Sequence, residues 1–118
     1  MTNEECILAL AALAQPTRLE TFKLLVANEP DGLSAGTIAE ALAVPNNTLS
    51  THLSILSRAQ LVSAKRYSRS VIYRANIKQF QMLIGFMVTD CCGGMPEVCA
   101  PILATLSPRC TSKEKLDG

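Results

Sequence analysis

Three cysteines lie within nine residues of one another, at Cys91, Cys92 and Cys99. Two glycines and a proline separate the second thiol from the third. These residue types favour a tight turn, which would bring Cys99 back over the adjacent pair. Thiolates select soft ions, and three sulfurs without a nearby histidine fit the usual four-coordinate zinc site poorly. The spacing therefore predicts a site for a thiophilic ion.

Two other uses of these thiols remain open. A redox signal could join them in a disulfide, although a bond between Cys91 and Cys92 would close a strained ring. A structural zinc site could form if Cys110 supplied a fourth sulfur, but the spacing of such a set is irregular. The fifth cysteine, Cys6, falls in a helical pattern. We expect it in the core, with approach to a partner's cluster as the alternative.

An amphipathic helical pattern over residues 77–90 leads directly into the cysteines. Its apolar side chains form a wide stripe for so short a helix. The stripe could pack within one chain, but a small helix-turn-helix protein commonly needs a two-fold partner to match two half-sites on DNA. We expect a homodimer seam made with a first helix over residues 3–13. The stripe consists of Ile77, Phe80, Leu83, Ile84, Met87 and Val88.

Hydrophobic periodicity predicts three further helices, over residues 16–27, from the N-cap Ser34 to Leu42, and over 47–59. A sharp turn over residues 43–46 joins the last two helices. Two helices joined by such a turn form the helix-turn-helix arrangement.

The helix over residues 47–59 has two contrasting faces. Leucines at positions 49, 53 and 56 form one inward stripe. The opposite face has small polar side chains and no carboxylate, so it could lie deep in a major groove and bond to base edges and phosphates. An ordinary solvated face, the alternative, would normally include Glu or Lys. The predicted DNA face consists of Asn47, Ser50, Thr51, Ser54 and Arg58.

Two β-prone runs, residues 61–67 and 71–75, surround a short polar segment and predict a β-hairpin. Basic residues at and near its tip suit a wing that rests on the phosphate backbone: Lys65, Arg66 and Arg69. Arg74 lies farther from the tip, where a structural role is the alternative.

The net charge of the chain is small, but the charged residues are unevenly distributed along the sequence. The net charge is +1, yet residues 41–89 contain no Asp or Glu. A local positive field suits contact with phosphate groups, although chance clustering on a solvated face is the simpler alternative. The cations of this stretch are Arg58, Lys65, Arg66, Arg69, Arg74 and Lys78.

Length and composition limit the class of protein. A chain of 118 residues with three Phe, two Tyr and no Trp supports one small aliphatic core, which favours helices. No apolar run reaches the roughly 18 residues needed to cross a bilayer, and Glu4 and Glu5 stand where a signal peptide would be basic. We therefore expect a cytoplasmic protein without membrane contact, whose cysteines are free thiols or ligands.

Several motifs in the right order resemble those of the ArsR-type (ArsR/SmtB) winged-helix metalloregulatory repressors. The resemblance covers roughly residues 5–90. Its motifs are residues 13–19 (LAQPTRL), 34–39 (SAGTIA), 47–56 (NTLSTHLSIL), 59–62 (AQLV) and the Tyr73-Arg74 pair.

The resemblance implies a homodimer that binds operator DNA without inducer, represses resistance genes and leaves the DNA when metal or metalloid ions bind. The first and fifth helices would form the dimer interface. Neither enzymatic activity nor a catalytic cofactor is expected, because no nucleophile, base and orienting acid come together by spacing. At matching positions, the residues at or beside the DNA would be Asn46, Asn47, Ser50, Thr51 and His52.

The departures from the family pattern limit which residues could form the inducer site. The third-helix cysteine pair of some arsenic sensors is absent from residues 33–40, and the single histidine, His52, cannot complete the fifth-helix site of the zinc sensors. Cys91, Cys92 and Cys99 resemble instead the site of a subgroup that responds to arsenite and antimonite. Trivalent arsenic needs only three thiolates. We expect arsenite as the inducer, with antimonite or another soft ion as alternatives.

These observations predict a mainly α-helical winged helix-turn-helix protein with a two-stranded β-hairpin, acting as a homodimer on double-stranded operator DNA. Residues 1–110 are expected to form a single domain that includes the cysteine site. The polar, charged residues 111–118 are expected to be a disordered tail.

Overall fold

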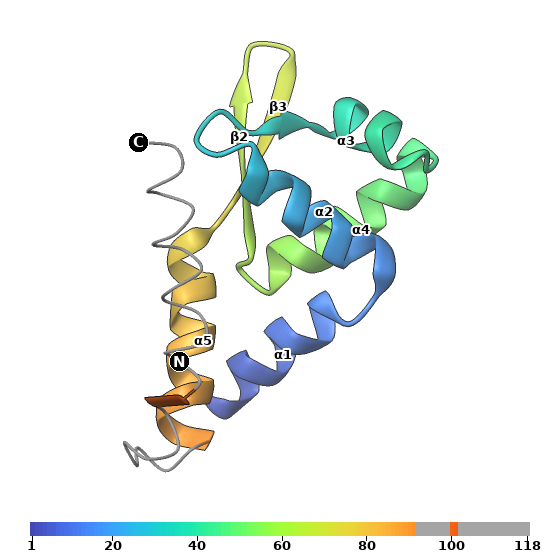
Figure 1. Ribbon diagram of the computed structural model, residues 1–118. Coiled ribbons are helices and arrows are strands. Elements are labelled where there is room, and N and C mark those ends of the chain that lie inside the picture. The colour runs from blue at the N-terminus through green and yellow to red at the C-terminus, as the bar shows by residue number, and fades with distance from the viewer. Residues whose placement is uncertain (92–99, 102–118) are drawn as a thin grey trace. The chain divides into compact units, whose positions relative to one another are not determined.

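Figure 1 shows a computed structural model of the chain, which describes residues 1–91 and 100–101. The chain divides into two units, Met1–Leu83 and Ile84–Gly118. No helix in the described ranges is long and apolar enough to cross a membrane. The elements are α1 (Asn3–Leu13), α2 (Pro16–Ala27), β1 (Leu33–Ser34), α3 (Ala35–Leu42), α4 (Asn46–Arg58), β2 (Val62–Tyr67), β3 (Ser70–Ala75) and α5 (Ile77–Cys91).

Local sequence signals set where the helices begin. Thr2 and Glu5 form a capping box, in which the Thr2 hydroxyl accepts the Glu5 N–H at 3.1 Å and the Glu5 carboxylate accepts the Thr2 N–H at 2.8 Å. The Ser34 hydroxyl accepts the N–H of Thr37 at 3.2 Å and so starts α3. The predicted helices are confirmed, and α4 begins one residue earlier than predicted, at Asn46.

Helix α4 buries the leucine stripe that its sequence predicts. Leu49, Leu53 and Leu56 are at most 1% exposed, and α4 contacts α1, α2 and α3. The rings of Phe22 in α2 and Phe80 in α5 lie 5.2 Å apart and are tilted by 50°, which attaches the start of α5 to α2. The core therefore fixes how α4 is rotated about its axis and which of its side chains face solvent.

Helix α1 is less buried than its apolar sequence predicts. Cys6 is buried as expected, beside Ala9. Ile7 is 66% exposed, Leu8 is 47% exposed and Leu10 is 39% exposed. In the single chain, α1 therefore packs its small side chains against the core and leaves Ile7, Leu8 and Leu10 exposed.

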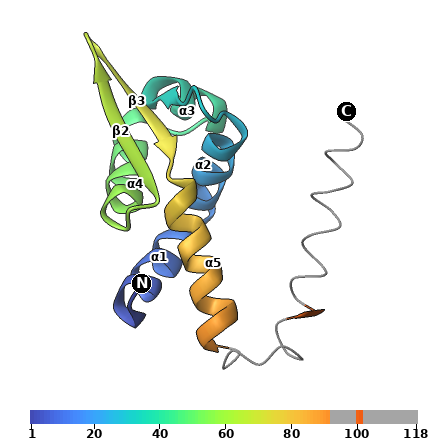
Figure 2. The same ribbon diagram turned by 90° about the vertical axis from the view of Figure 1, so that its left-hand side faces the viewer.

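The predicted hairpin between α4 and α5 is present and gains a third strand. β2 and β3 pair antiparallel from Val62 opposite Ala75 to Tyr67 opposite Ser70. The short strand β1 pairs with the other edge of β3, which gives the order β1-β3-β2. β1 was not predicted, because two residues carry no periodicity. Figure 2 shows β2 and β3 extending beyond the helices as a wing.

Gly32 allows the chain to approach β3 closely before β1 begins. Its φ is +76°, and a Cβ there would lie 2.5 Å from the carbonyl oxygen of Tyr73. We expect Gly32→Ala to lower the free energy of unfolding by about 2 kcal/mol or more, measured by urea denaturation. Gly36→Ala is the matched control, because its Cβ would meet nothing within 4 Å. The control should be neutral or stabilising by up to about 1 kcal/mol, and equal losses would contradict the close approach.

Candidate nucleic-acid interface

The solvent face of α4 carries the predicted polar side chains. Two of them make short local contacts: the Thr51 hydroxyl donates to the carbonyl oxygen of Asn47 at 3.3 Å, and Arg58 donates to the Ser54 hydroxyl at 3.4 Å. The set is free of carboxylates and presents donors and acceptors to solvent, as a helix in a DNA groove requires. Its exposed members are Asn46, Asn47, Ser50, Thr51, Ser54 and Arg58.

The N-terminus of α4 also suits an anion. Its N-cap is Pro45, which offers no side-chain acceptor, and the first turn contains no acidic residue. The N–H groups and the positive dipole end of a helix favour phosphate at such a position. The start of α4 is therefore suited to a phosphate group.

His52 lies at the edge of this face and is half-buried. Its ring Nδ1 lies 3.3 Å from the guanidinium Nη1 of Arg18, in α2. The same guanidinium donates from Nε to the carbonyl oxygen of Ala12 at 2.7 Å. The structure thus places His52 beside the exposed face but joins one side of its ring to α2.

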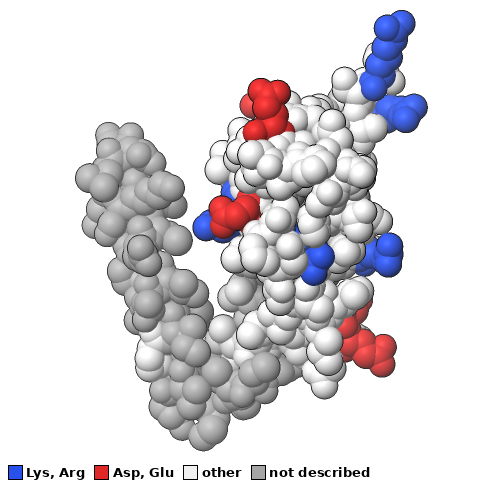
Figure 3. All heavy atoms as spheres, turned by 90° about the vertical axis from the view of Figure 1, so that its right-hand side faces the viewer, with Lys and Arg blue, Asp and Glu red and all other residues white. Residues whose placement is uncertain are grey.

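The wing carries three exposed cations. Lys65 and Arg66 lie on β2, and Arg69 lies in the two-residue turn that connects Tyr67 to Ser70. The Lys65 ammonium group lies 5.4 Å from the centre of the Tyr67 ring, which holds it near the tip. Figure 3 shows Lys and Arg side chains projecting at the top of the view, where the wing ends. The cations therefore lie exposed at and near the tip, and their contact with phosphate stays a prediction.

Arg74 has a different role from the cations of the wing tip. It makes a two-pronged ion pair with Glu29 at distances of 2.8 and 3.2 Å, which joins β3 to the segment after α2. The hydrogen bond from Arg74 lowers the pKa of Glu29, and the same bond raises the pKa of Arg74. A structural role for Arg74, which the sequence left open, is confirmed, because the carboxylate of Glu29 already neutralises its charge.

The predicted cysteine site lies mostly beyond the described residues. Cys91 is the last residue of α5, and Cys92, Cys99 and Cys110 lie outside the described ranges, as do residues 111–118. Within residues 1–91 and 100–101, no three His, Cys, Asp or Glu side chains are grouped so that they could hold a metal ion.

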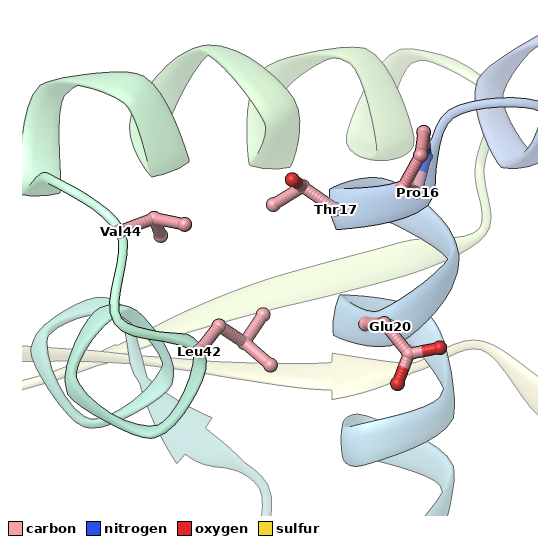
Figure 4. A pocket seen from close by; sticks show the side chains of 5 residues that line it. All are labelled: Pro16, Thr17, Glu20, Leu42 and Val44. Carbon is pink, nitrogen blue, oxygen red and sulfur yellow. The ribbon is translucent and has the colours of Figure 1, made fainter.

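A small pocket lies between α2 and the turn after α3. Its volume is about 160 Å³. Thr17 and Leu42 face the space, as Figure 4 shows. Ligand pockets are usually about 300 to 1,000 Å³, so this pocket is too small for a typical effector. Its lining residues are Pro16, Thr17, Glu20, Leu42 and Val44.

Three contacts near the interface were not predicted from the sequence. Arg18 stands in the 13–19 motif but was given no role, and Glu29 was assigned to no element or site. Asn76 joins the end of α4 to the start of α5 through hydrogen bonds to the backbone at both ends. Two of them carried a local signal, since Arg18 belongs to a motif and Asn76 is a capping residue type three positions before Gln79. Glu29 carried none, because its partner Arg74 is 45 positions away.

Comparison with known proteins identifies relatives of this chain in sequence and in structure. A family model described as a helix-turn-helix domain matches residues 13–63. The transcriptional repressor SdpR of Bacillus subtilis (strain 168) is 31% identical over 77 residues, which make up 65% of this chain and 82% of SdpR.

Two solved structures share the fold. An ArsR-like transcriptional regulator from Rhodococcus sp. RHA1 is 22% identical with a TM-score of 0.63, over 96% of this chain and 92% of that one. The homodimeric winged helix-turn-helix DNA-binding domain of a possible ArsR-family regulator from Mycobacterium bovis is 24% identical with a TM-score of 0.61, over 74% and 79%. These likenesses confirm the predicted winged helix-turn-helix fold.

A substitution of Arg69 tests whether the wing tip contacts DNA phosphates. Arg69→Ala should weaken binding to any DNA duplex and lower the slope of log K against log salt concentration by about 0.9, because one fewer phosphate is neutralised. Fluorescence anisotropy over a salt series measures this slope. Lys23→Ala is the control, since Lys23 lies on α2 and pairs with Glu20 at 3.4 Å. The same slope in Arg69→Ala and the wild type would argue against a phosphate contact.

Glu29→Gln tests the link between Arg74 and the segment after α2. Because folding lowers the pKa of Glu29, its charge stabilises the fold above the ordinary carboxyl pKa of about 4.3. That contribution is lost as the pH falls through the lower folded value. The variant should therefore lose about 0.5 to 1 kcal/mol of unfolding free energy at pH 7, and less at more acid pH.

Urea denaturation at a series of pH values measures this difference. Glu20→Gln removes the carboxylate of the exposed pair with Lys23 and serves as the control, for which we expect a smaller change. A Glu29→Gln defect that grows toward acid pH would contradict the sign of the linkage.

Proposed function

We propose, from the premise that this chain belongs to the ArsR family of winged-helix transcriptional regulators, that it leaves its operator DNA when trivalent arsenic or antimony binds. The premise rests on the 31% identity to SdpR over 82% of that protein and on the shared fold. As a member of this family, the chain is a DNA-binding transcriptional repressor and not an enzyme. The inducer and the way it acts are the proposal.

The observation that carries the proposal is the position of the thiols. Cys91 ends α5, and Cys92 and Cys99 follow within eight residues. These three would hold the ion as thiolates, and three sulfurs satisfy trivalent arsenic or antimony, whereas zinc in a structural site takes four ligands. When bound, the ion would tie the three sulfurs together at the end of α5.

The exposed apolar side chains support a homodimer. Ile7 and Leu8 on α1, and Ile77 and Met82 on α5, are 37% to 66% exposed in the single chain. Covering them removes apolar surface from water, which favours association. The relative from Mycobacterium bovis with this fold is homodimeric. We therefore propose that α1 and α5 form the seam between two copies.

Asn76 links the start of α5 to the segment that directly follows α4. Its backbone N–H donates to the carbonyl oxygen of Leu61 at 2.8 Å, and its side-chain amide donates to the carbonyl oxygen of Gln60 at 2.8 Å. Its side-chain oxygen accepts the N–H of Gln79 at 3.3 Å, in the first turn of α5. A movement of α5 would therefore be transmitted through these hydrogen bonds to the residues that follow α4. Helix α4 carries the candidate DNA face.

Coupling of this kind requires the ion to favour the DNA-free arrangement over the DNA-bound one. A differential free energy of about 1 to 3 kcal/mol is typical of regulators, and it corresponds to a loss of DNA affinity of about 5-fold to 150-fold. By linkage, operator DNA must weaken the binding of the ion by the same factor.

The test uses a duplex selected from random sequence by the purified protein. Sodium arsenite, added under reducing conditions, should lower the affinity of the wild type for this duplex by at least about fivefold. Cys92→Ser should bind the duplex as tightly as the wild type and stay bound in arsenite, because one thiolate is missing. Cys6→Ala is the matched control, since Cys6 is buried in α1, and it should still be released.

Each other outcome has a distinct meaning. Wild-type protein that stays on the duplex while arsenite saturates its thiols would rule out the proposed inducer. Release by zinc or by an oxidant, and not by arsenite, would establish the alternative of another thiophilic ion or a thiol-redox signal. Loss of DNA binding in Cys92→Ser without any ion would indicate a structural cluster. Cys110→Ser shows whether a fourth sulfur takes part.

A further inference from the structure

Arg18 joins three parts of the helical core. Its backbone N–H donates to the side-chain oxygen of Gln15 at 2.8 Å, at the start of α2. Its guanidinium donates to the carbonyl oxygen of Ala12, in the last turn of α1, and reaches His52 on α4. The side chain is only half-exposed, so its charge is directed into these contacts.

The chemistry of the pair determines where the proton of His52 lies. A guanidinium has donors only and keeps its charge in proteins, so Nδ1 of His52 must accept the bond from Arg18. An imidazole that accepts at Nδ1 carries its single proton on Nε2. The half-buried ring therefore has a donor on the side away from Arg18.

We propose that Arg18 is a positioning residue for operator binding, which fixes His52 in the Nε2–H form so that this ring donates a hydrogen bond to DNA. The phosphate oxygens of DNA only accept hydrogen bonds. The N7 atoms of purines in the major groove are likewise acceptors only. A ring with its proton on Nδ1 would present a lone pair to these acceptors and repel them. The inference rests on the DNA-binding function proposed above but not on the identity of the inducer.

The chain offers a direct spectroscopic test, because it contains a single histidine. In protein labelled with 15N in the imidazole ring, two ring signals therefore report His52 alone. The wild type without DNA should show Nε2 protonated and Nδ1 unprotonated and hydrogen-bonded. Arg18→Met keeps an apolar stem of similar length but removes the donors, so the Nδ1 signal should move toward that of a free imidazole. Arg58→Met is the matched control, since Arg58 contacts Ser54, and it should leave both signals unchanged.

DNA binding supplies the second readout. Arg18→Met should lower the affinity for the selected duplex by about fivefold, the effect of one lost hydrogen bond, without changing the salt slope. His52→Gln places an amide nitrogen where Nε2 was and should retain more affinity than His52→Ala. Adding Arg18→Met to His52→Ala should cause no further loss, because Arg18 acts through the ring.

Three results would overturn the inference. Unchanged ring signals in Arg18→Met would show that the guanidinium does not set the tautomer. A salt slope lowered by about 0.9 would show that Arg18 itself contacts a phosphate. Additive losses in the double variant would show that the two residues act separately. A wild type that binds no duplex would contradict the proposed function instead, and the ring signals would still decide whether Arg18 sets the tautomer of His52.

Discussion

One-sided burial of α4 is the constraint on which the rest of the structure depends. Leu49, Leu53 and Leu56 recur at helical spacing and are almost fully buried. Each buried leucine stabilises the fold by about 2 kcal/mol relative to an exposed one. Rotating α4 by a quarter turn would expose these side chains and would therefore cost several kcal/mol of folding free energy. This cost keeps the small polar side chains facing solvent, although none of them makes a bond strong enough to fix the helix.

The helices could be predicted from the sequence because their signals are local. Capping residues lie within three positions of the groups they cap, and the apolar stripes repeat every three or four residues. The contacts that connect these helices could not be predicted in this way. Arg74 meets Glu29 across 45 positions and Arg18 meets His52 across 34, and no periodicity identifies such partners.

The charges also show that contacts between residues distant in sequence cannot be predicted from a local pattern. Residues 41–89 carry six cations and no acid, which predicts a local positive field. In the folded chain, Glu29, from outside that stretch, neutralises Arg74. The cations at the wing tip and Arg58 remain exposed. The predicted DNA-facing side chains of α4 and of the wing tip are therefore exposed, and their contact with DNA stays a prediction. The acid that pairs with Arg74 lies outside residues 41–89, so a count of charges within that stretch does not include it.

The pairing of the wing strands has a consequence for how a narrow groove could be filled. Successive residues of a strand point to opposite faces, so Lys65 and Arg66 lie on opposite sides of a ribbon only two strands wide at its tip. The minor groove of B-DNA is about 6 Å wide and has a wall of phosphates on each side. A ribbon with a cation on each face can neutralise both walls at once, whereas a ribbon with both cations on one face would leave one wall unpaired. The two-residue turn fixes the strand register and therefore which face of the ribbon each cation occupies, since a shift of one residue would exchange the two faces.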